Sequence, residues 1–151
     1  MQYLTYLIKI VSSLFLGALI GFERDQQNKP MGLRDIMLVS LGATLLTIIA
    51  FELSKLMPDT ANYDIGRIMS YTIASIGFLG SGIIIQNKNK FEGITTGSLL
   101  FSVLAIGFLC GLGLYVLAII SAVAIYLILK LKHIRIELER GVKKCRKIKL
   151  R

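Results

Sequence analysis

Long apolar segments separated by short polar ones run along the whole chain. Three of these segments have about the 20 predominantly apolar residues that an α-helix needs to cross the hydrocarbon core of a bilayer. They are residues 3–22, 36–57 and 68–85. Hydrophobic residues make up 54% of the chain, against about 45–50% in a soluble domain. The pattern therefore predicts membrane-spanning helices.

A fourth uncharged segment, residues 94–129, is too long for a single crossing. As one helix it would reach roughly 54 Å at about 1.5 Å per residue, nearly twice the thickness of the core. Three glycines between positions 107 and 113 offer a place for the chain to turn. We therefore predict two further helices, over residues 93–110 and 112–131.

The charges between these segments predict the orientation. With five spans, one side of the membrane receives the loops 23–35 and 86–92 and the C-terminal tail, which hold three, two and ten Lys or Arg residues. The other side receives the N-terminus and the loop 58–66, without Lys or Arg. Because cytoplasmic loops carry an excess of Lys and Arg, we predict an all-α, polytopic bundle of five transmembrane helices. Its N-terminus lies outside and its C-terminus in the cytoplasm.

The formal net charge of +9 belongs mainly to the tail. We therefore divide the chain into a transmembrane domain, residues 1–131, and a basic cytoplasmic tail, residues 132–151. Apolar positions in the tail recur at steps of three and four, which favours a helix that continues the fifth span, although residues 134–138 also alternate like a strand. Its cations favour anionic lipid headgroups. Nucleic acid is disfavoured because no aromatic residue is interleaved with them.

The glycine-rich stretch SIGFLGSGI at residues 75–83 is typical of either a phosphate-binding loop or a helix-packing surface. A dinucleotide loop needs G-x-G-x-x-G directly after a strand, but here the spacing is reversed within an apolar segment, so we exclude the loop. On a helix, small residues at steps of three and four let two backbones approach closely. The residues predicted to pack in this way are Gly17, Gly21, Ser70, Ala74, Gly77, Gly80, Ser81, Gly82, Gly107 and Gly111.

These faces have three possible partners: another span of the same chain, a second copy in a homodimer, or a foreign membrane complex. The sequence alone leaves the three open. In the second span, Ser40, Thr44 and Thr47 form a stripe of hydroxyls that we expect to face protein rather than lipid.

Polar residues near the helix ends supply the candidate chemistry. Asp64 is placed to cap the third helix, with Arg67 in its first turn. Thr95 and Thr96 begin the fourth span, where their hydroxyls either bond amides at the helix start or bind a small anion or a partner's polar group. Glu52 is the acid clearly inside a span, so it is a candidate intramembrane acid; the alternative is an interfacial residue that reaches water.

No metal, cofactor or catalytic site is predicted. A Mg²⁺ path needs oxygen ligands around the ion, and the middle of the spans contains no acid pair, which counts against such a path within one subunit. No nucleophile with a base is evident, and the single histidine, His133, lies among the lysines of the tail.

Several ordered motifs together resemble a known family, the MgtC/SapB membrane proteins. They are GFER (21–24), GLR (32–34), MLVSLGA (37–43), DIGRI (64–68), IGFLGSG (76–82) and GITTG (93–97). The family pattern A-G-L-R-T-H appears here as MGLRDI, so a histidine is missing and an aspartate is present. The polar residues that match the family motifs are Glu23, Arg24, Arg34, Asp64, Arg67, Thr95 and Thr96.

The resemblance implies a multi-pass protein of a prokaryotic plasma (inner) membrane, involved in adaptation to low magnesium or stress and, in pathogens, in virulence. It implies a non-enzymatic regulator that binds another membrane complex, such as the proton-translocating ATP synthase, and a homodimer is expected. The alternative is a transporter or channel for Mg²⁺ or another small solute. Many members carry a cytoplasmic ACT-like domain after the last span, and we expect none before Arg151.

Overall fold

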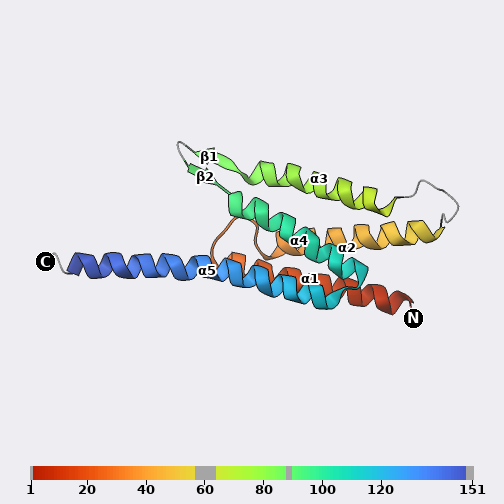
Figure 1. The fold of residues 1–151 in the computed structure, drawn as a ribbon, viewed down its shortest axis with the longest axis horizontal. Helices are drawn as coiled ribbons and strands as arrows, with labels where there is room; N and C mark the ends of the chain where they lie inside the picture. The colour runs from red at the N-terminus through yellow and green to blue at the C-terminus, as the bar shows by residue number, and fades with distance from the viewer. Residues whose placement is uncertain (1, 57–63, 88–89, 149–151) are drawn as a thin grey trace.

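A computed structural model of the chain describes the backbone of residues 2–56, 64–87 and 90–148, and the side chains of residues 2–56, 64–84 and 93–131. It contains five helices and one short hairpin (Figure 1). The helices are α1 (Gln2–Gln26), α2 (Leu33–Leu56), α3 (Ile65–Ile83), α4 (Ile94–Leu112) and α5 (Tyr115–Ile148). The hairpin pairs β1 (Ile85–Asn87) with β2 (Lys90–Glu92) in antiparallel register.

Successive helices run in opposite directions along the long axis of the molecule (Figure 1). The α1–α2 loop and the β1–β2 hairpin lie at one end, which we call the hairpin end. The start of α1, the end of α2 and the α4–α5 turn lie at the other, which we call the N-terminal end. The predicted all-helical bundle is confirmed, apart from the hairpin that occupies part of the predicted loop 86–92.

Three of the helices, α1, α2 and α4, are long and apolar enough to cross a membrane among the residues that the structure describes. Helix α3 has 19 residues, and the apolar part of α5 covers Tyr115–Leu131. Helix α5 then continues without a break to Ile148, so the basic tail is helical up to that residue. Whether all five helices span the bilayer, and which end faces the cytoplasm, stay predictions.

Local chemistry explains two of the helix boundaries. Gly113 ends α4 in the left-handed conformation, with φ of 82°, and its amide donates to the carbonyls of Cys110 and Leu109. Glycine adopts this conformation without the steric cost of a Cβ. The predicted glycine turn is therefore confirmed. Asp64 caps α3 as predicted, because its carboxylate accepts a hydrogen bond of 2.8 Å from the Gly66 amide.

Helix α4 is central and packs against all four other helices. Two of its glycines lie directly on α2: a Cβ on Gly107 would be 2.4 Å from the Ser40 carbonyl oxygen, and one on Gly111 would be 2.5 Å from the Thr47 Cβ. In α1, a Cβ on Gly21 would be 2.7 Å from the Leu33 Cα. Such distances are too short for any side chain, so glycine sets the approach of α1 and α4 to α2.

The hydroxyl stripe of α2 is buried among these helices, as the sequence predicts. Ser40 and Thr44 are fully buried, and Thr47 is almost so. The Ser40 hydroxyl lies 2.9 Å from the Ser13 hydroxyl of α1, and Thr44 donates to the Gly107 carbonyl of α4 at 2.9 Å. Thr47 donates to the Ala43 carbonyl of its own helix. Each buried hydroxyl therefore has a partner inside the protein, as an apolar surrounding requires.

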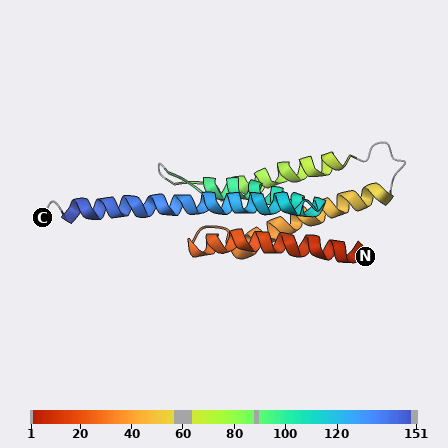
Figure 2. The ribbon, with the colours of Figure 1, turned by 60° about the horizontal axis from the view of Figure 1, so that its bottom comes forward.

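Helix α3 buries one of its six predicted packing residues, Gly80. Figure 2 shows α3 on the opposite side of the bundle from α1, and its main helix contacts are with α4 and α2. Its buried residues are Ile76 and Gly80, with Gly80 against Gly97 of α4. The other five small residues expected to pack are exposed: Ser70, Ala74, Gly77, Ser81 and Gly82. Within the described part of the chain these residues are left uncovered, because the helix turns the Ile76–Gly80 side toward α4.

Candidate functional site

Arg24 joins the two halves of the chain at the hairpin end. Its side chain is only 2% exposed. Its Nη2 donates to the Thr96 hydroxyl at 2.5 Å and to the Pro30 carbonyl at 2.9 Å. Thr96 is buried in the first turn of α4, so this contact ties the end of α1 to the start of α4. The Arg24 Nε is also buried, and it has no hydrogen-bond partner among the described residues.

The residue that caps α4 is a glycine rather than a threonine. Gly93 occupies the cap position with φ of 91°, and as a glycine it offers no side-chain oxygen to cap the helix. A Cβ at this position would be 2.2 Å from the Ile83 carbonyl oxygen. Thr96, one of the two threonines considered for the cap, accepts a hydrogen bond from Arg24 instead. Thr95 is exposed and lines the cavity described next.

A cavity of about 690 Å³ opens beside Arg24. We call it the loop cavity. One wall consists of residues 27–30 of the α1–α2 loop, and another of residues 93–96 at the start of α4. Leu129 of α5 closes a third side. The cavity therefore collects a buried arginine, the exposed Lys29 and the first turn of a helix, all of which favour negative charge.

The carboxylates next to Arg24 bond to other groups. Glu23 is 8% exposed and accepts a hydrogen bond of 2.8 Å from the Gln27 side chain. The Asp25 carboxylate accepts from the Leu33 amide at 3.1 Å and so fixes the start of α2. It also lies against Gly32, where a Cβ would overlap an Asp25 oxygen. Asp25 is not among the residues predicted from the sequence. The sequence feature that could have indicated its role is an acid a few residues before Gly32, the glycine that precedes α2.

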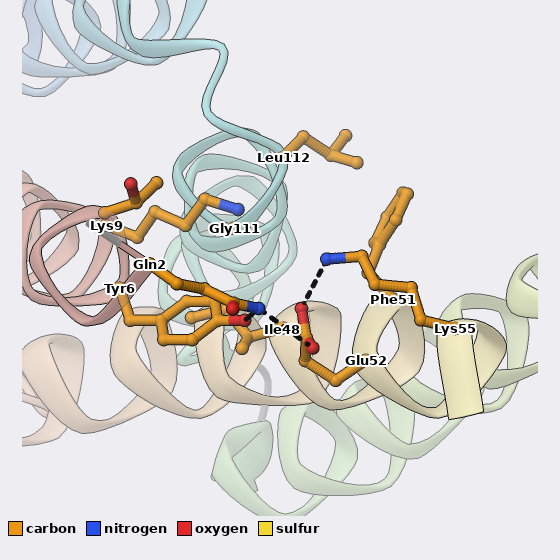
Figure 3. Close-up of a pocket in the computed structure, with 10 residues that line it drawn as sticks. Gln2, Tyr6, Lys9, Ile48, Phe51, Glu52, Lys55, Gly111 and Leu112 are labelled. Atoms are coloured by element: carbon orange, nitrogen blue, oxygen red, sulfur yellow. Dashed lines mark hydrogen bonds and ion pairs between the residues drawn. The ribbon is translucent and has the colours of Figure 1, made fainter.

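Glu52 lies in a polar pocket at the N-terminal end, together with Lys9, Lys55, Gln2 and Tyr6 (Figure 3). Its carboxylate forms an ion pair of 2.7 Å with Lys55 of the next helical turn. The Gln2 amide lies 3.5 Å from the other carboxylate oxygen. The Glu52 side chain is 32% exposed and that of Lys55 is 63% exposed. Within the protein, Glu52 is thus a partly exposed, paired acid near the end of α2.

The remaining polar residues of the family motifs do not join either site. Arg34, Asp64 and Arg67 are exposed, and Asp64 serves as the cap of α3. The exposed serines of α3 bond to carbonyls of their own helix: Ser70 to Gly66 and Ser81 to Phe78. Among the described residues, no three His, Cys, Asp or Glu side chains lie close enough to share a metal ion.

Comparison with known proteins gives a family match over most of the chain. The model of the MgtC family matches residues 10–137. The chain belongs to the MgtC family. The MgtC protein of Salmonella typhimurium is 34% identical over 120 residues, which cover 80% of this chain and 49% of that protein. No solved structure matches significantly.

Two further relatives also match over part of their own length. The SapB protein of Bacillus subtilis is 29% identical over 72% of this chain and 48% of its own length. A protein of Escherichia coli named putative magnesium transporter YhiD is 28% identical over 85% of this chain and 60% of its own length. The chain spans about half the length of the curated relatives it matches. The matched region contains both Arg24 and Thr96, and it ends within α5.

Proposed function

We propose that this member of the MgtC family is a non-enzymatic plasma-membrane protein that acts in adaptation to low magnesium by binding and regulating another membrane complex. The observation that carries the proposal is the exposed face of α3, formed by Ser70, Ala74, Gly77 and Ser81 and here called the α3 face. Apart from its own helix, no described part of the chain lies within 4 Å of where a Cβ on Gly77 would stand. Small residues at this spacing suit close approach by another transmembrane helix.

The interior of the bundle supports binding rather than transport. Glycine contacts bring α1 and α4 close to α2, and the buried hydroxyls of Ser13, Ser40 and Thr44 bond to one another or to backbone carbonyls. A path for a hydrated divalent cation needs oxygen ligands that are free to replace water. In the described core of this chain, the buried hydroxyls already have hydrogen-bond partners within the protein, so they are not free to bind a cation. A regulator of the proton-translocating ATP synthase, or of another complex, needs no such path.

The second candidate is a transporter or channel for Mg²⁺ or another small solute. The pocket around Glu52 favours it, because an acid there could attract a cation at the N-terminal end. The relative named as a putative magnesium transporter also favours it. The Lys55 ion pair and the lysine at position 9 weaken this candidate, since they place positive charge in the same pocket.

A transport assay separates the two candidates. The purified protein is placed in liposomes, and Mg²⁺ entry is followed with an internal fluorescent indicator. We expect no flux above that of empty liposomes, and no difference between the protein and its Glu52→Gln variant. A flux that disappears in Glu52→Gln but persists in Asp64→Asn, a matched exposed acid, would overturn the regulator proposal in favour of transport.

The partner is sought in parallel by affinity purification from membranes of magnesium-starved cells. We expect a defined membrane complex to co-purify with the intact chain and to be lost with Gly77→Leu. Normal thermal stability of the variant in detergent shows that its loss of partner is not a loss of folding. If dimerisation, stability and partner recovery all stay normal in Gly77→Leu, the proposed role of the α3 face is wrong.

A further inference from the structure

Arg24 carries a buried positive charge that no carboxylate neutralises in the part of the chain whose side chains are described. Its printed partners, the Thr96 hydroxyl and the Pro30 carbonyl, are neutral, and its buried Nε has no partner. The neighbouring Glu23 and Asp25 bond to Gln27 and to the Leu33 amide. A buried charge without a counter-charge is costly. The surroundings of Arg24 therefore favour an anionic ligand.

Two further sources of positive potential face the same space. Helix α4 begins at the loop cavity without a side-chain cap, so its cap residue supplies no oxygen to the first-turn amides. Amides at a helix start, together with the helix dipole, favour anions. Lys29 lines the cavity from the α1–α2 loop. Arginine, lysine and a helix N-terminus thus converge on one cavity from three elements.

We propose that the loop cavity binds a phosphate group. A guanidinium charge and the amides of a helix start suit the several oxygens of a phosphate better than they suit a single-atom anion. The volume of about 690 Å³ leaves room for a phosphate together with the group that carries it. The inference is independent of the proposed function, because regulators and transporters alike can hold such a ligand.

An apolar hollow next to the loop cavity bears on the source of the phosphate. It lies between α4 and α5, has a volume of about 120 Å³ and shares Thr95 and Leu129 with the loop cavity. Leu99 and Ile128 are among its other walls. A membrane lipid whose phosphate lies in the loop cavity could extend an acyl chain along this hollow. Free phosphate would leave the hollow empty. The chemistry in the loop cavity is the same for both sources.

Two binding measurements on the full chain test the proposal. Purified protein in detergent is titrated with inorganic phosphate by calorimetry. Its retention of phosphatidylglycerol, after extraction from vesicles of that lipid mixed with phosphatidylcholine, is measured by native mass spectrometry. We expect Arg24→Gln to weaken binding of at least one probe by about tenfold, as for loss of a charge-assisted bond. Lys29→Gln, which removes an exposed charge, should weaken it by about threefold.

Matched controls separate the loop cavity from general charge. Arg67→Gln and Lys55→Gln remove the same side chains from exposed positions outside the loop cavity, and both should bind like the unmodified chain. The basic tail attracts anionic lipid equally in every variant, so the differences between variants report the cavity. If Arg24→Gln does not fold, the test is the comparison of probe binding by Lys29→Gln and Lys55→Gln, and only Lys29→Gln should bind more weakly than the unmodified chain.

The outcomes assign the source or reject the site. Lipid retention that falls in the two cavity variants, without binding of inorganic phosphate, identifies a lipid headgroup. Inorganic phosphate binding that falls in the same variants identifies free phosphate as a ligand. If neither probe binds, or if the cavity variants bind as the controls do, the proposal is overturned.

Discussion

Arg24 and Thr96 show what residue-level analysis could and could not predict. Both were singled out by their motifs, but their pairing was not foreseen, because they lie 72 positions apart and neither the spacing nor the periodicity relates them. The contact depends on how α1 and α4 pack on α2, which follows from the whole bundle. Asp25 was missed for a similar reason, since its role appears only once the loop folds back to Leu33.

Thr96→Val should destabilise the protein. Valine keeps the shape of threonine but leaves Arg24 Nη2 without its hydroxyl partner, next to an Nε that is already unpaired. Loss of a hydrogen bond to a charged group costs about 1.5–3 kcal/mol. Thermal unfolding in detergent should therefore show a lower Tm. Ser98→Ala is the control, because the Ser98 hydroxyl is exposed and bonds only to a carbonyl of its own helix. Equal Tm values for the two variants would contradict the role of Thr96.

The boundaries of the elements were the most predictable feature, because they depend on local chemistry. An aspartate that caps α3 and a glycine that ends α4 both act within a few residues of their own positions. The face that each helix presents was harder to predict. Lipid tails are as apolar as the protein interior, so hydrophobic periodicity does not distinguish a lipid-facing side from a protein-facing one. This is why Ile76 and Gly80, rather than Gly77 and Ser81, turn toward α4.

Gly107→Ala tests the close packing of α4 on α2. The added methyl group would lie 2.4 Å from the Ser40 carbonyl oxygen and 2.5 Å from the Ala43 Cβ, which is well inside van der Waals contact. The two helices must therefore separate. Overpacking of this kind costs about 1–3 kcal/mol, and we expect a lower Tm in detergent. Gly42→Ala on α2 is the matched control, since apart from its own helix no described part of the chain lies within 4 Å of the added Cβ. A stable Gly107→Ala variant would contradict the contact.

At the scale of the whole molecule, the alternating directions of the five helices agree with the charge distribution of the sequence. Arg24 at the end of α1 and Lys29 in the α1–α2 loop both lie at the hairpin end, and the C-terminal part of α5 extends past this end (Figure 1). The number of helices could be predicted because apolar length restricts a short chain to few arrangements. The orientation in the membrane, which rests on the positive-inside rule, stays a prediction.

The orientation can be measured with reporters fused to each end of the chain. We expect an enzyme reporter that is active only in the cytoplasm to work at the C-terminus, and one that is active only outside to work at the N-terminus. The excess of Lys and Arg at the hairpin end is the physical reason. A C-terminal reporter exposed outside the cell would contradict the five-span topology.

The central claim is that the α3 face binds another membrane protein. The most direct test compares two identical changes at exposed alanines, Ala74→Leu on the α3 face and Ala124→Leu on α5. Both variants, and the unmodified chain, are purified from membranes of magnesium-starved cells, and recovery of the partner complex or of a second copy is quantified. We predict that Ala74→Leu loses the associated protein while Ala124→Leu retains it, with equal Tm for both. Full recovery with Ala74→Leu would contradict the account.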